Sequence, residues 1–112
     1  MQAAFVGFVQ AFLPETPTQF GMVEFASTAV VRLSFTGTET TITSEINEPR
    51  EEPGSQYTNW QQGLIKARDL FPNRSNPNLV IFASDGNPNR TGNDQSVSES
   101  VAVADAVTVA NQ

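Results

Sequence analysis

The sequence predicts a single α/β domain with a mixed sheet. Residues 79–83 are consecutive apolar residues rich in β-branched and aromatic types, which is typical of a strand buried on both faces. Residues 19–26 and 29–35 have the composition of two further strands. Apolar residues recur at helical spacing in three other segments: 1–13, 58–71 and the stretch from Ser96 onward. Strands that alternate with helices in this order indicate an α/β fold.

The composition excludes several classes of function. The chain has 112 residues, a formal net charge of -6 and a single lysine, Lys66, which argues against nucleic acid or an anionic membrane surface as the partner. It contains neither cysteine nor histidine, which excludes disulfides, zinc-thiolate sites and Ser-His-Asp hydrolysis. No apolar run approaches the ~18 residues that a membrane-spanning helix needs.

The first half of the chain should form a helix and a hairpin. Phe5, Val9 and Phe12 lie on one helical face, and the prolines that follow end this helix. Only two residues separate the strands at 19–26 and 29–35, which favours a tight antiparallel hairpin at the edge of the sheet. A short helix over 38–46 and a polar loop over 47–55 come next.

The second half should contain two capped helices. Trp60, Leu64, Ala67 and Phe71 form an apolar stripe, and Thr58 with Gln61 matches a capping box at the start of that helix. A second capping box, Ser96 with Glu99, should open the last helix.

Asp85 follows the predicted strand at 79–83 directly. A carboxylate at the carboxyl end of a buried parallel strand is where open α/β sheets place their ligand crevices. The alternative is that Asp85 and Gly86 form only a turn that stops the strand.

Three stretches together resemble the von Willebrand factor type A (vWA) domain. Residues 20–27 (Phe-Gly-Met-Val-Glu-Phe-Ala-Ser) look like its second strand, and residues 54–60 resemble its Gly-x-Thr-Asn turn before the third helix. Residues 79–89 resemble its fourth strand with the Ser-Asp-Gly-x-Pro signature. The resemblance covers essentially all of residues 1–112 and implies a doubly wound, Rossmann-like sheet with one antiparallel edge hairpin and helices on both faces.

The resemblance also implies a metal-ion-dependent adhesion site (MIDAS). Its members hold Mg²⁺, or Mn²⁺ or Ca²⁺, at the carboxyl ends of the strands, and a carboxylate of the protein ligand completes the shell. Carried over to this chain, Thr58 is the hydroxyl ligand and Asp85 the carboxylate ligand. Hard oxygens of this kind are what Mg²⁺ prefers.

One departure from the family pattern limits this expectation. The chain contains no Asp-x-Ser-x-Ser motif, which in the family follows the first, central strand. We therefore expect an internal fragment of a larger vWA domain, lacking the first strand and the C-terminal strands, in which Thr58 and Asp85 bind metal weakly or not at all.

The expected function is a non-enzymatic, metal-assisted protein-binding or adhesion module of a bacterial surface or secreted protein. The first alternative is a structural or assembly vWA domain that holds no metal. The second is a hydrolase or phosphotransferase that uses Asp85, but the chain lacks both a Gly-rich phosphate loop and the expected Asp-x-Asp spacing.

Overall fold

The computed structural model describes residues 2–48, 57–71, 77–84 and 86–112. The elements follow one another in this order: α1 (Gln2–Phe12), β1 (Phe20–Phe25), β2 (Ala29–Thr36), α2 (Glu39–Asn47), α3 (Trp60–Leu70), β3 (Arg90–Thr91), β4 (Gln95–Ser96) and α4 (Glu99–Ala110). The predicted polar loop at 47–55 lies largely outside the described residues.

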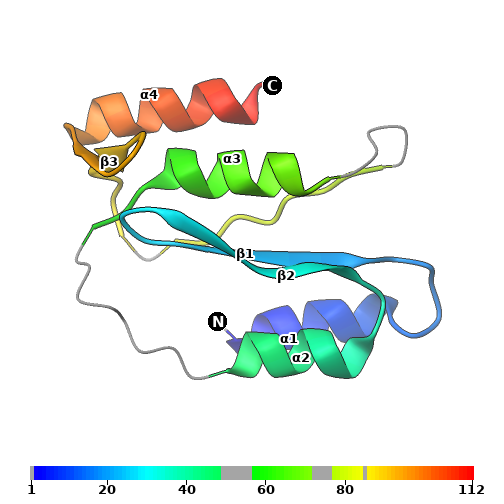
Figure 1. The fold of residues 1–112 in the computed structure, drawn as a ribbon. Coiled ribbons are helices and arrows are strands. Elements are labelled where there is room, and N and C mark those ends of the chain that lie inside the picture. Colours follow the sequence, from blue (N-terminus) through cyan, green and yellow to red (C-terminus); the bar gives the residue numbers. More distant parts are fainter. Residues whose placement is uncertain (1, 49–56, 72–76, 85) are drawn as a thin grey trace.

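The elements stack in layers around the β1–β2 hairpin. Helices α1 and α2 lie on one side of the hairpin and α3 on the other, with α4 packed on the far side of α3 (Figure 1). The α/β composition with helices on both sides of β1–β2 therefore agrees with the predicted fold class. A doubly wound parallel sheet stays a prediction, because the described residues form two separate antiparallel pairs, β1–β2 and β3–β4.

The β1–β2 hairpin is confirmed as predicted. Val23 pairs with Val31 and Phe25 with Ala29, so the register closes on the short turn that follows Phe25. Burial in β2 alternates as predicted only around Leu33, which is half-buried between exposed Arg32 and Ser34; Val31, expected on the covered face, is 39% exposed.

A small apolar core joins α1 and α2 to the hairpin. Val9, Leu13 and Ile42 are buried together, and three partly buried side chains pack against them: Phe20, Leu33 and Ile46. The predicted N-terminal helix and the short helix at 38–46 are thus both confirmed, and each contributes its apolar stripe to this core.

Small residues allow the layers on the other side to approach closely. A Cβ added at Gly63 of α3 would lie 2.8 Å from Phe25 Cδ1, so the helix backbone rests almost directly on the ring. Ala102, Ala106 and Val109 are the buried residues of α4, which packs on α3. The cap prediction for α4 is wrong: its N-cap is Ser98, without a side-chain cap bond, because Ser96 is paired with Arg90 in the β3–β4 hairpin.

The prediction of a buried central strand at 79–83 is wrong. The segment belongs to no strand pair, and Leu79 and Ile81 are 73% and 49% exposed. It runs along α3 and the hairpin in Figure 1, and Phe82 stacks on Phe25 with ring centroids 5.1 Å apart. The physical reason is that no strand among the described residues pairs with its backbone, so the contact with β1 through Phe82 leaves most of its side chains uncovered.

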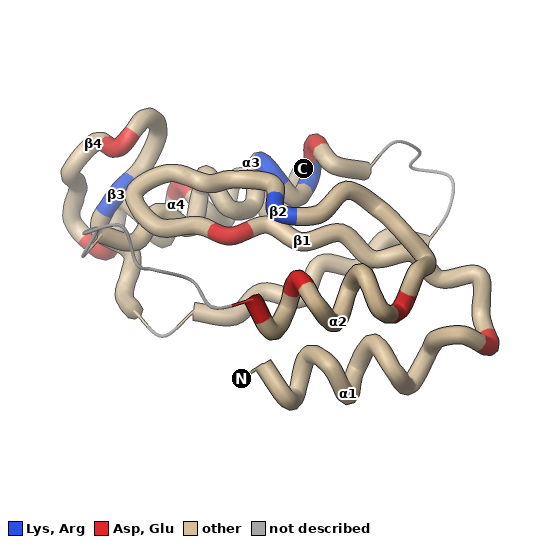
Figure 2. Tube along the Cα trace, turned by 60° about the horizontal axis from the view of Figure 1, so that its bottom comes forward, with Lys and Arg blue, Asp and Glu red and all other residues tan. Residues whose placement is uncertain are grey.

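Charge is distributed without a basic patch over the described part of the chain. Figure 2 shows the basic residues of the described ranges on β2, α3 and β3, with Lys66 and Arg68 both on α3. Three of them are in ion pairs: Arg32 with Glu24, Arg68 with Asp69, and Arg90 with Asp94. In the described ranges no helix is both long enough and apolar enough to cross a membrane.

Candidate functional site

Thr58 lies in the turn before α3, with its hydroxyl against the turn that follows the 77–84 segment. A Cβ placed on Gly86 would lie 3.1 Å from Thr58 Oγ1. The two stretches that the sequence singled out, 54–60 and 79–89, therefore meet in space at this hydroxyl. Asp85, the predicted carboxylate ligand, lies outside the described residues.

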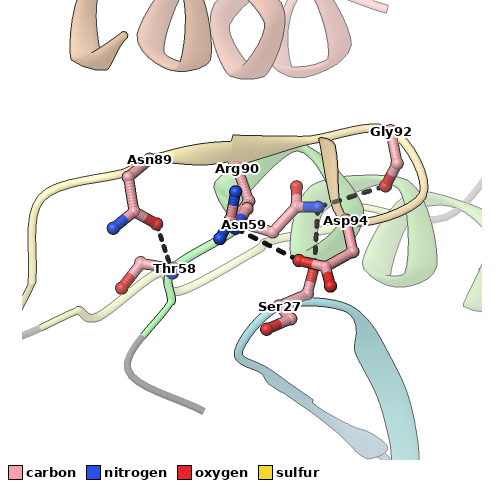
Figure 3. Close-up of polar contacts among 7 residues, drawn as sticks. All are labelled: Ser27, Thr58, Asn59, Asn89, Arg90, Gly92 and Asp94. Atoms are coloured by element: carbon pink, nitrogen blue, oxygen red, sulfur yellow. Dashed lines mark hydrogen bonds and ion pairs between the residues drawn. The ribbon is translucent and has the colours of Figure 1, made fainter. Parts of the chain in front are cut away.

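Asn89 forms hydrogen bonds with both the N–H and the carbonyl of Thr58. Thr58 N–H donates to Asn89 Oδ1 at 2.9 Å (Figure 3). The Thr58 carbonyl accepts from the backbone N–H groups of Asn89 and Arg90 at 3.0 and 3.1 Å. The loop after Gly86 is thereby fixed to the turn that carries the hydroxyl.

Asn59 is the buried centre of the surrounding polar network. It is 0% exposed, and its Nδ2 donates to the carbonyls of Ser27 and Gly92 at 2.9 and 3.1 Å (Figure 3). Its Oδ1 accepts from Gln62 N–H at 3.0 Å, which makes Asn59 the N-cap of α3. Both hydrogens and the oxygen of this amide are therefore used, as burial of a polar side chain requires.

The capping prediction for Thr58 is wrong by one residue. Asn59, and not Thr58, is the N-cap of α3, and the Thr58 hydroxyl faces Gly86. Gln61 does not form the predicted capping box: its Oε1 accepts from the Gly92 N–H at 2.7 Å and from the Thr91 hydroxyl at 2.6 Å.

The β3–β4 hairpin forms one wall of this region. Its three-residue turn uses positive φ at Gly92 and Asp94, 53° and 64°, which glycine and aspartate tolerate better than most residues. The Thr91 hydroxyl lies 2.6 Å from Asp105 Oδ2, so α4 is tied to the same hairpin.

Arg90 brings a positive charge next to Thr58. Its guanidinium carbon lies 3.6 Å from the centroid of the Tyr57 ring, a cation–π contact. Its buried Nε is 3.2 Å from Asp94 Oδ1 with the geometry of an ion pair rather than of a hydrogen bond (Figure 3).

Ser84, the residue before Asp85, contacts Gly86 and Trp60. Its hydroxyl donates to the Gly86 carbonyl at 3.0 Å and accepts from Trp60 Nε1 at 3.2 Å. Trp60 also meets the Phe82 ring edge-on, with centroids 5.5 Å apart. The 77–84 segment thus reaches the site through contacts with the first residue of α3.

The donor chemistry at this place suits a divalent cation, whereas the number of donors is small. The Thr58 hydroxyl is a hard oxygen, the kind of ligand that Mg²⁺ accepts, and it faces Gly86, the residue after Asp85. Among the described residues there is no group of three or more His, Cys, Asp and Glu side chains that could hold a metal ion.

Sequence reasoning did not assign functional roles to Asn59, Asn89, Gln61 or Gly92. The Gly-Asn-Asp run at 92–94 is a hairpin signal that could have located the β3–β4 turn. No local signal points to the amide contacts, because they join residues about thirty positions apart in the chain.

Comparison with known protein families identifies the class. The model of the von Willebrand factor type A domain family matches residues 1–87. The chain belongs to this family, as the resemblance of its three motifs implied. Domains of this family commonly mediate protein interactions and are generally not enzymes. No curated protein and no solved structure matches the chain.

Proposed function

We propose that this chain is a non-enzymatic protein-binding module of the vWA type in which a divalent cation at Thr58 and Asp85 assists the binding of a partner protein. The cation is Mg²⁺, or Mn²⁺ or Ca²⁺ in its place, and the partner contributes a carboxylate to it. Such a cation binds a partner as a Lewis acid whose remaining positions accept hard oxygen ligands.

One observation carries this proposal. The Thr58 hydroxyl lies 3.1 Å from where a Cβ on Gly86, the residue after Asp85, would be, and it does not cap α3, whose N-cap is Asn59. This contact supports the proposal, because Thr58 and Gly86 belong to the two motifs that bear the family's ligand positions and are far apart in the sequence.

The test is thermal unfolding of the chain, followed by circular dichroism, in EDTA and in millimolar Mg²⁺ or Mn²⁺. An ion present at about ten times its dissociation constant should raise the midpoint by roughly 5 °C for a domain of this size. Thr58→Ala and Asp85→Ala should abolish this rise, whereas Thr58→Ser, which keeps the hydroxyl, should retain it.

Asp69→Asn is the matched control. It removes a carboxylate at the far end of α3, where Asp69 pairs with Arg68, and should leave the metal-dependent rise unchanged. A midpoint that is the same in EDTA and in metal for the unaltered chain would overturn the metal-assisted function.

A second candidate is a vWA module that binds its partner without metal. Two observations favour it: the sequence lacks the Asp-x-Ser-x-Ser motif, and the described part of the chain offers no cluster of three metal-ligating side chains. Partner binding that is insensitive to EDTA would favour this candidate.

We also propose that the module acts outside the cell, as part of a larger surface or secreted protein of a bacterium. The habits of the family and the acidic composition support this location, and the absence of cysteine is compatible with it. Protease treatment of intact cells, with detection of the domain by antibody, tests it: loss of the signal is expected, and full protection would contradict it.

A further inference from the structure

The backbone of Thr58 is oriented by one side chain. Asn89 Oδ1 accepts the Thr58 N–H at 2.9 Å, while the Thr58 carbonyl is held by the main chain of Asn89 and Arg90 (Figure 3). The carbonyl contacts persist whatever side chain stands at position 89. A substitution at position 89 can therefore remove only the hydrogen bond from the Thr58 N–H to Asn89 Oδ1.

The orientation of the Thr58 backbone decides where its hydroxyl points. Threonine is β-branched and has few favourable χ1 rotamers, so the direction of the main chain limits the directions in which Oγ1 can point. In the structure Oγ1 points toward Gly86 and lies 3.1 Å from where a Cβ on Gly86 would be.

The same short loop contacts Thr58 at both of its ends. Gly86 lies at the hydroxyl and Asn89 at the backbone, and Pro88 between them is fully buried. A loop closed on one residue with a buried proline inside it has little freedom to change shape. We therefore expect the Thr58 hydroxyl to move relative to Gly86 when the hydrogen bond to Asn89 Oδ1 is lost.

We propose that Asn89 is the positioning residue of the candidate site, and that its Oδ1 holds the Thr58 hydroxyl against the turn at Gly86. The consequence for cation affinity rests on the proposed function, whereas the placement of the hydroxyl does not. A residue that only stabilises the loop would change the stability of the chain without changing the surroundings of Thr58.

The test compares Asn89→Ala, Asn89→Asp and Asn87→Ala with the unaltered chain. Asn89→Asp keeps an acceptor oxygen at the same place, and Asn87 is an exposed residue of the same loop. Three quantities are measured by NMR: hydrogen exchange at the Thr58 amide, the nuclear Overhauser contact between Thr58 and Gly86, and the dissociation constant of Mn²⁺ from line broadening. Circular dichroism establishes that each variant is folded.

Asn89→Ala should speed exchange at the Thr58 amide by up to about tenfold, as expected for a lost hydrogen bond. It should also weaken the Thr58–Gly86 contact and lower Mn²⁺ affinity about 10- to 100-fold, the usual effect of removing a group that orients a ligand. Asn89→Asp and Asn87→Ala should keep the exchange rate and the contact, and neither should weaken Mn²⁺ binding.

Two results would overturn the proposal: an Asn89→Ala variant whose Thr58–Gly86 contact is unchanged, whatever its Thr58 exchange rate, or an Asn89→Asp variant that behaves like Asn89→Ala. If the unaltered chain binds no Mn²⁺, the proposed metal-assisted function fails, and exchange and the Overhauser contact still decide the role of Asn89.

Discussion

At the scale of single residues, Asn59 connects three parts of the chain through its side-chain amide. Its amide joins the β1–β2 turn, the start of α3 and the β3–β4 turn, through Ser27, Gln62 and Gly92. Because Asn59 is fully buried, water has no access to replace these bonds when the side chain is removed.

Asn59→Ala should therefore lower the free energy of unfolding by about 3 kcal/mol, from the lost cap and the unpaired carbonyl groups. Urea unfolding followed by circular dichroism measures this loss. Asn87→Ala, at an exposed position, should change the same quantity by less than about 0.5 kcal/mol.

Asn59→Asp separates the two contributions. It keeps an oxygen for the Gln62 N–H and so retains the cap, but it replaces the donor to Ser27 and Gly92 with an acceptor. If this variant were as stable as the unaltered chain, the bridging role of Asn59 would be wrong and only the cap would count.

At the scale of elements, the contact between α3 and β1 depends on a missing side chain. Gly63→Ala would bring a Cβ to 2.8 Å from Phe25 Cδ1, and that ring cannot swing away freely because it is stacked on Phe82. Overpacking of this kind costs about 1–3 kcal/mol, which exceeds the gain of up to ~1 kcal/mol in helix propensity.

Gly7→Ala is the matched change in another helix. No atom lies within 4 Å of the Cβ that it would add, so only the helix propensity acts. We expect Gly63→Ala to lower and Gly7→Ala to raise the urea midpoint. A stabilising Gly63→Ala would show that α3 can move away from β1 at little cost.

The sequence predicted the elements whose evidence is local. Helical spacing located α1, α2, α3 and α4, and the two-residue gap after residue 26 located the β1–β2 hairpin. The prediction of a buried strand at 79–83 was wrong because burial requires neighbouring strands, and no pattern within the segment can show whether these are present. The β3–β4 hairpin was missed since each of its strands has only two residues, too few to show a period.

For the site, the family resemblance predicted Thr58 and Asp85 as metal ligands, and this stays a prediction; in the structure the Thr58 hydroxyl faces Gly86, the residue after Asp85. The cap was placed one residue early, because Thr58 and Asn59 are both good capping residues and only the geometry of the turn distinguishes them. The roles of Asn59 and Asn89 depend on contacts between distant segments and could not be read from the motif.

At the scale of the whole molecule, the layer that contains the hairpin ends in an exposed, uncharged apolar segment. Leu79, Val80, Ile81 and Phe82 are all more than a third exposed. An uncovered segment of this kind favours association with other chains.

Leu79→Lys should reduce the association of the chain at high concentration and leave its stability nearly unchanged, because Leu79 is 73% exposed. Light scattering across a concentration series measures the association. Phe82→Ala, the control, should instead cost roughly 1–2 kcal/mol, since Phe82 packs on Phe25 and Trp60. Equal association of Leu79→Lys and the unaltered chain would mean that another surface drives it.

The contacts of Trp60 give the molecule an internal optical reporter. Trp60 is the single tryptophan of the chain, and its indole touches both the Phe82 ring and the Ser84 hydroxyl. Its fluorescence emission therefore reports whether residues 82–84 are docked on α3. Undocking that precedes global unfolding will appear as a red shift in emission while the helical circular dichroism signal is still intact.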